Sequence, residues 1–322
     1  MSKVLMLGAL MLLAACATVP RGPALTLGEA GEAVTSTSQA SLTGLSDDIA
    51  LIAARQMVRT AIIKCVPGNC VPGKVTAQVE AGALDAQKLS DALMLRARAL
   101  GKLHGAYAAF AEEARYDAPG DLQGAVQSLF TATNAAATAA TAAGFFPAVP
   151  ALAIAGPIVS GIAGQSAAKA QSARLKAGSV AIKAANARIA DIMAAEQVRY
   201  AEIAEDVNNN LDNIVATLFE NDMADPLPSI AAFEAPLGLK PPAKLPPDKA
   251  RAAALTIANY RNWMAQKTAG DVYAANVAAL AALREEHDNF EAGAPLQMSD
   301  VEHSLTVLAG WVSIARGVAP DD

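Results

Sequence analysis

Aromatic residues are scarce in this sequence, and so are cysteine, histidine and charge. Only 4% of the 322 residues are aromatic although 53% are hydrophobic, and the excess is alanine. Alanine favours helix over strand, so closely packed helices are expected. The formal net charge is −6, and a surface without a basic excess argues against nucleic acid as a partner.

Recognisable catalytic motifs are also missing. The patterns GxSxG and HExxH do not occur. The three histidines, His104, His287 and His303, lie on separate expected helices, and none follows a glutamate by three positions as in di-iron bundles. We interpret His287, within the charged run 284–288, as part of a solvated helix face. The sequence therefore predicts no enzyme, no catalytic residue, no metal and no cofactor.

The longest apolar run at the N-terminus is short. Residues 4–13 are almost all apolar, but a bilayer span needs roughly 20 such residues. Leu13, Ala14, Ala15 and Cys16 then fill four lipobox positions in order, so the first sixteen residues resemble a bacterial lipoprotein signal. This resemblance implies a signal peptide over 1–15, cleavage before Cys16 and acylation of Cys16. Because Ala17 rather than aspartate follows, it also implies a lipid anchor on the periplasmic side of the outer membrane.

Two cysteines remain beyond Cys16. Cys65 and Cys70 bracket a Pro-Gly pair, which is typical of a type II turn. Such a turn brings two thiols together, and an oxidising periplasm favours a disulfide between them. Zinc is the alternative, but two thiols with no nearby histidine leave a tetrahedral site half empty.

The same segment resembles a nucleotide-binding loop only in part. Residues 68–74 match GxxxxGK, but Val75 stands where a magnesium-binding serine or threonine is needed. Pro72 removes an amide that would bind phosphate, and the preceding residues have helical rather than strand periodicity. We therefore expect no nucleotide.

An all-α fold is predicted: an elongated bundle of about five to six helices with long coiled-coil-like helices and an apolar Ala/Gly hairpin. Residues 16–45 are rich in Gly, Pro, Ser and Thr and are expected to form a flexible tether, followed by a single bundle domain over 46–322. Ser46 is the expected first N-cap. Helices are expected over 46–64, from 84 to the Pro119-Gly120 pair, over 121–144, 151–165, 167–221 and 248–290, and from 299 onward, with a Pro-rich extended connector at 223–247.

Two of these helices have clear apolar faces. One is formed by Leu89, Leu93, Leu100, Leu103, Tyr107, Phe110 and Ala114. The other has coiled-coil spacing and so needs partner helices, through Leu175, Ile182, Ile189, Met193, Tyr200, Ile203 and Val207. Trp263, Trp311 and Tyr200 are expected to be core anchors.

Residues 122–168 contain no charged side chain. Pro147 and Pro150 break the helical pattern in the middle, so the region predicts a hairpin of two helical arms with an aromatic tip. Its candidate membrane or partner contacts are Phe145, Phe146, Val149, Leu152, Ile154, Ile158, Val159 and Ile162.

Over 121–221 this outline resembles the cytolysin A type of α-helical pore-forming toxins, in which an apolar hairpin between long helices inserts into a membrane. The lipobox departs from the pattern of that family. The favoured prediction is therefore an outer-membrane lipoprotein with a structural or protein-interaction role, with a protein partner or self-association through its helices. The alternative is a membrane-active protein that inserts its hairpin into a bilayer.

Overall fold

The structure is a computed structural model, and it describes residues 21–65, 72–116, 119–142, 147–153, 167–220, 222, 224–234 and 246–318. These residues contain helices and no strand, which confirms the predicted all-α class. The helices of the described residues are α2 (Arg21–Cys65), α3 (Pro72–Tyr116), α4 (Pro119–Ala142), α5 (Ala167–Glu220), α6 (Leu227–Glu234), α7 (Pro247–Ala292) and α8 (Ser299–Val318).

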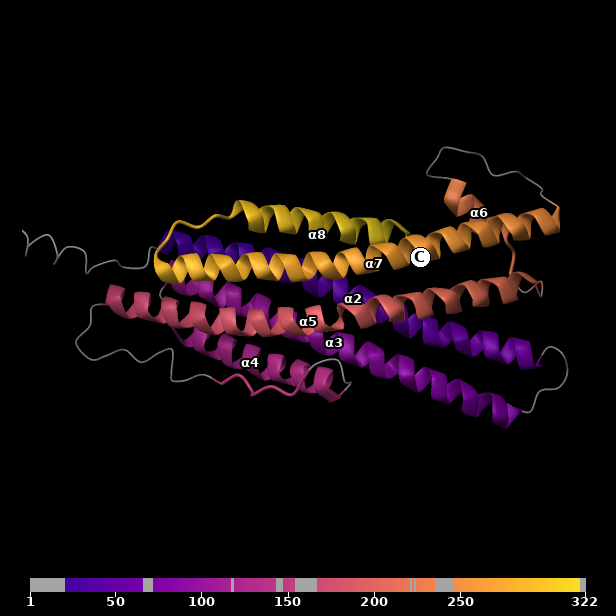
Figure 1. The fold of residues 1–322 in the computed structure, drawn as a ribbon, viewed down its shortest axis with the longest axis horizontal. Coiled ribbons are helices and arrows are strands. Elements are labelled where there is room, and N and C mark those ends of the chain that lie inside the picture. Colours follow the sequence, from indigo (N-terminus) through magenta and orange to yellow (C-terminus); the bar gives the residue numbers. More distant parts are fainter. Residues whose placement is uncertain are drawn as a thin grey trace, which may run out of the picture.

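The long helices lie side by side and form an elongated bundle (Figure 1). Helices α2 and α3 form an antiparallel pair, and α5 pairs with α7, while α4 and α8 cover only part of the length (Figure 1). With 54 residues, α5 reaches about 80 Å at 1.5 Å per residue. The predicted helices over 167–221, over 248–290 and from 299 onward agree closely with α5, α7 and α8.

The predicted tether over 16–45 is wrong for its described part, because residues 21–45 form the first half of α2. Ala24, Leu27 and Val34 are fully buried there. The glycines allow close helix packing instead of flexibility: a Cβ on Gly28 would lie 2.8 Å from Cβ of Ala111 on α3. Residues 1–15 and Cys16 lie outside the described residues.

Several hydroxyl groups of this half of α2 are bonded within the helix. The Oγ1 of Thr35 donates to the carbonyl of Gly31 at 2.6 Å, and Thr37 and Thr43 donate to the carbonyls four residues earlier. Bonds of this kind satisfy serine and threonine without breaking a helix. The composition that predicted a tether is therefore compatible with a continuous helix.

Three predicted helix boundaries are also wrong. Ser46 is not an N-cap; it lies inside α2, and its Oγ is 2.8 Å from the Oγ of Ser90 on α3. The helix expected from 84 begins at Pro72, where proline suits a first helical position. Pro119 likewise begins α4, after α3 has ended at Tyr116.

A main core runs through the bundle and joins α2, α3, α4, α5, α7 and α8. It contains the predicted face of α3 from Leu100 to Ala114 and the seam positions of α5 from Leu175 to Met193. Leu93 of the same face is buried as well. The side chains of Leu89, Tyr200, Ile203 and Val207 lie outside the described set. Trp311 packs partly buried against this core as expected, whereas Trp263 is 53% exposed and is not a core anchor.

A second, smaller core lies where α5 ends and α7 begins. It consists of Phe219, Ile230, Ala250 and Ala254, with partly buried neighbours around them. Ile230 belongs to α6, so the connector predicted as extended over 223–247 contains a short helix. The spacing of Leu227, Ile230 and Ala231 places apolar residues on one side of that helix, and this is sufficient to fold it onto α7.

Candidate functional site

The predicted hairpin is described only in part. Its first arm corresponds to α4, but residues 151–153 are not helical, contrary to the expected second arm. Of the eight predicted contact residues, Val149 and Leu152 are described. Outside the described residues lie Phe145, Phe146, Ile154, Ile158, Val159 and Ile162. Cys70 lies outside them too, and Cys65 is the last residue of α2.

Residues 147–153, here named the surface segment, are all apolar, and most are exposed. Asn134 of α4 holds the segment through two hydrogen bonds to the backbone of Leu152. Its Nδ2 donates to the carbonyl oxygen at 2.9 Å, and its Oδ1 accepts from the backbone N–H at 2.8 Å. One side chain thus satisfies both polar groups of Leu152, as a neighbouring strand would.

Further contacts fix the rest of the surface segment. The Nη1 of Arg188 on α5 donates to the carbonyl of Pro150 at 3.3 Å, and the Oγ1 of Thr141 donates to the carbonyl of Pro147 at 3.4 Å. Leu152 packs partly buried against the main core. The segment is therefore fixed against α4 and α5, while its alanines and prolines are exposed.

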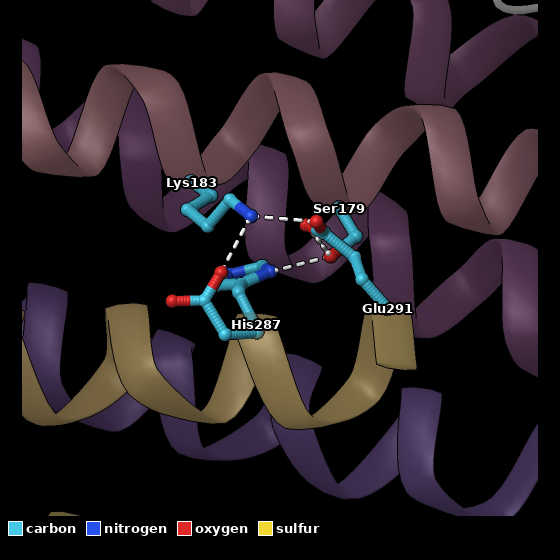
Figure 2. A network of polar contacts seen from close by, with 5 residues as sticks. Ser179, Lys183, His287 and Glu291 are labelled. Atoms are coloured by element: carbon cyan, nitrogen blue, oxygen red, sulfur yellow. Dashed lines mark hydrogen bonds and ion pairs between the residues drawn. The ribbon is translucent and has the colours of Figure 1, made fainter. Parts of the chain in front are cut away.

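A second candidate site is the buried polar cluster around His287, which joins α3, α5 and α7. Figure 2 shows its part on α5 and α7. Tyr107, Ser179 and His287 are fully buried. The Oγ of Ser179 on α5 lies 2.8 Å from His287 Nδ1 and donates to Oε1 of Glu291 at 3.0 Å. The hydroxyl of Tyr107 on α3 lies 3.0 Å from His287 Nε2.

These contacts assign the protons of the cluster. Because Ser179 donates its one hydrogen to Glu291, Nδ1 of His287 carries the hydrogen and donates to Ser179. Nε2 then accepts from Tyr107. Burial, together with the charge of Lys183 and against that of Asp288, lowers the pKa of His287 to about 3, so the imidazole is neutral. Burial also raises the pKa of Tyr107, which keeps its hydroxyl a donor.

The cluster reaches the surface through Lys183. Its Nζ donates to Oδ1 of Asp288 at 2.8 Å and to Oε2 of Glu291 at 2.6 Å (Figure 2). Partial burial lowers the pKa of Lys183, but its bonds to Asp288 and Glu291 outweigh this and raise the pKa overall. Glu291 thus binds a charged lysine at one oxygen and the buried serine at the other.

Chemically, this arrangement resembles a serine–histidine pair, but its hydrogen bonds point the wrong way for a nucleophile. An activated serine donates to a histidine base, whereas Ser179 donates to Glu291 and accepts from His287. Ser179 and His287 are also completely enclosed by protein. The cluster therefore serves to hold α3, α5 and α7 in register.

Two further buried ion pairs bridge α3 and α5. Arg96 pairs with Glu196, whose Oε2 also accepts from the hydroxyl of Tyr273 on α7 at 3.0 Å. Glu113 accepts from Nε of Arg174 at 2.8 Å, and its carbonyl accepts from Gln171 at 2.6 Å. With the His287 cluster between them, these pairs form three polar layers along α3.

The sequence does contain a signal for the burial of His287. Leu280, Leu283, His287 and Phe290 step by 3, 4 and 3 and are all buried, so His287 continues an apolar stripe. The interpretation of His287 as part of a solvated face is wrong because His287 is fully buried, and Glu286 beside it is buried too, while Arg284, Glu285 and Asp288 are exposed. Ser179 similarly lies between the seam positions Leu175 and Ile182.

Within the ranges that the structure describes, no helix combines the length and apolar character needed to cross a membrane. The same ranges hold no group of three or more His, Cys, Asp or Glu side chains placed to bind a metal ion. No protein-family model, curated protein or solved structure matches this chain. Function is therefore argued from the geometry alone.

Proposed function

We propose that this protein is a lipid-anchored lipoprotein of the outer membrane, facing the periplasm, with a structural or protein-interaction role in the cell envelope. The observation that carries the proposal is the surface segment 147–153, an apolar stretch held on the outside of the bundle by hydrogen bonds from Asn134, Thr141 and Arg188. Exposed apolar side chains fixed in one arrangement are typical of a contact surface.

Fixing the surface segment in advance matters because binding then costs less entropy. A mobile apolar loop has to be ordered when its partner arrives, whereas a segment already bonded at three points does not. The main core supports this role, since the hydrogen bonds within its polar layers tie α3, α5 and α7 together. The bundle is then a scaffold that presents the segment.

The proposal has finer parts. It includes coiled-coil-like packing along α5 and an apolar hairpin over 122–168. The proposed lipid anchor is Cys16, and Cys65 and Cys70 are proposed to form a disulfide. The role is not enzymatic and uses no metal, cofactor, nucleotide or nucleic acid. The buried seam positions of α5 are consistent with helix pairing within the bundle or between copies.

The anchor is tested by mass spectrometry of the protein from cells. The expected mature chain begins at Cys16 and carries acyl chains, and it fractionates with the outer membrane. The Cys16→Ser variant provides the matched control, because it should keep its leader and lose the lipid. An unmodified Cys16 in a processed chain would refute the proposed anchoring.

The alternative, a membrane-active hairpin, is favoured by the same exposed apolar segment and needs its own test. The mature domain without Cys16 is mixed with dye-loaded vesicles, beside an Ala148→Asp/Ala151→Asp variant that puts two charges on exposed positions. Ala194→Asp/Ala195→Asp, at exposed positions of α5, is the control. Release abolished only by the first variant would support insertion; no release from any protein supports the interaction role.

A further inference from the structure

One end of the bundle is defined by the start of α2, the end of α3 and the start of α5. Arg115 donates to Glu29 at 2.9 Å, which places the end of α3 against the first turns of α2. The bond from Gln171 to the carbonyl of Glu113 brings the start of α5 to the same level. Arg21, Tyr116 and Lys169 are exposed here, and this set of residues is named the proximal end.

The chain length before α2 restricts where this end can lie. Cys16 is five positions before Arg21, so a fully extended chain spans at most about 18 Å between them. Had residues 16–45 formed a tether, the bundle could have moved roughly 100 Å from its anchor. The helical start of α2 removes that freedom.

The side chains of the proximal end suit a lipid surface. Tyr116 is 69% exposed, more than any other large hydrophobic residue described, and Arg115 lies over its ring at 5.8 Å. Tyrosine and arginine with exposed polar groups are typical of membrane–water interfaces. Arg21 and Lys169 add cations, but three acids, the exposed Glu29 and Asp121 and the half-buried Glu112, lie at this end as well. The tyrosine rather than charge therefore distinguishes it.

Apart from the surface segment 147–153, the large hydrophobic residues exposed on the sides of the bundle form no continuous stripe among the described residues. Tyr260 and Trp263 form one aromatic pair on α7, with Lys267 over the Trp263 ring at 5.5 Å. The other two, Val180 and Val307, lie on α5 and α8. An amphipathic surface that lies flat on a bilayer needs a continuous apolar stripe. The body is also acidic overall, with a formal net charge of −6, which disfavours broad contact with anionic lipid.

We infer that the bundle stands on the membrane on its proximal end, with Tyr116 and its neighbouring cations against the lipid headgroups. This inference rests on the proposed lipid anchor. Asn134, which holds the surface segment, is 15 residues into α4 and so lies about 20 Å along the bundle from this end. The segment then faces the periplasm above the bilayer, so its partner is a protein and not the lipid to which the chain is anchored.

The test measures energy transfer from two matched positions on α5 to the bilayer. Lipidated full-length protein is placed in phosphatidylethanolamine–phosphatidylglycerol vesicles that carry an acceptor on their headgroups. A donor is attached through a noncanonical amino acid at position 169 or 220, both exposed and about 76 Å apart along the helix. The upright arrangement predicts transfer at 169 that is several-fold greater than at 220.

Each other result is informative. Similar transfer at both positions means that the rod lies flat, and stronger transfer at 220 means that it is inverted; either overturns the inference while the anchor stands. If the protein is not lipidated and does not bind the vesicles, the proposed anchor itself fails and the inference falls with it. The Cys16→Ser chain sets the background.

Discussion

The two cores of this molecule differ in how they are held together. The main core joins six helices and contains three polar layers, whereas the second core consists of four buried residues where α5, α6 and α7 meet. A large core with many long-range contacts opens only when the whole protein unfolds, and a small one opens locally. The comparison predicts a rigid half beside the proximal end and a more easily opened end beyond it (Figure 1).

The polar layers and the apolar residues around them make different contributions to the fold. Alanine is common in the main core, and it lets helices approach closely but buries little area per residue. Buried polar groups contribute specificity instead, since each has one arrangement that satisfies its bonds. The register of α3, α5 and α7 therefore depends on a few polar residues.

The largest effect is expected at the Arg96–Glu196 pair. Arg96→Met leaves the carboxylate of Glu196 buried without its cation, which should lower the free energy of unfolding by about 3 to 5 kcal/mol. Urea denaturation followed by circular dichroism measures this. The double variant Arg96→Met/Glu196→Leu removes both charges and should recover most of the loss. A double variant as unstable as the single one would contradict the charge-based explanation.

Phenylalanine truncation compares the two cores directly. Phe110→Ala removes a fully buried ring from the main core and should cost about 3 to 5 kcal/mol in the main unfolding transition. Phe219→Ala makes the same change in the second core, where we expect faster hydrogen exchange in α6 and little shift of the main transition. Equal shifts in the two variants would mean that the two cores unfold as one unit.

His287 makes the main core sensitive to acid. In the unfolded chain it binds a proton near its ordinary pKa of 6.5, whereas the folded chain holds it neutral down to a pKa of about 3. The unfolded state thus binds more protons as the pH falls through this window, and stability declines by about 1.4 kcal/mol per pH unit. Between pH 6.5 and 4.5 the expected loss is roughly 2 to 3 kcal/mol.

The pH effect is measured as the difference in urea stability at the two pH values. His287→Gln lacks the titrating group and should lose that part of the slope, because its amide does not bind a proton. His303→Gln changes an exposed histidine and should keep the slope. Parallel pH profiles for the native protein and His287→Gln would contradict the neutral buried histidine.

Substitutions at two glycines of α2 should give the smallest changes in stability, and the two changes should have opposite signs. A Cβ at Gly31 would collide with the ring of Tyr107, so Gly31→Ala should destabilise the protein by about 1 to 3 kcal/mol. At Gly44 nothing lies within 4 Å of an added Cβ, and Gly44→Ala should stabilise the helix by about 0.5 to 1 kcal/mol. Thermal denaturation of both variants gives the comparison, and equal effects would mean that α2 is not packed against α3 as described.

The long periodic helices could be predicted because their apolar stripes repeat over many turns. The stripe from Leu93 to Ala114 and the seam from Leu175 to Met193 are buried as expected. Helix ends at prolines were less predictable: Pro72 and Pro119 begin helices, and the sequence alone does not show on which side of a proline the chain turns helical.

Residues 21–45 and the His287 cluster were missed because their meaning depends on a partner helix. Glycine, serine and threonine suit a linker when α2 is considered alone, but they suit close packing once Ala111 and Tyr107 of α3 are placed beside them. His287 likewise has neighbouring charges in sequence but buried partners on α3 and α5. Asn134 is hydrogen-bonded to the backbone of Leu152, 18 positions later in the chain, and no sequence pattern predicts this contact.

The interaction role is tested most directly by photocrosslinking in living cells. A photoreactive amino acid replaces Ala148 on the surface segment, and in a control strain it replaces the exposed Ala194 on α5. We predict one discrete protein adduct from position 148, or a dimer of this chain, and none from position 194. The account would be contradicted if position 148 gave adducts to lipid alone, or if positions 148 and 194 gave the same adducts.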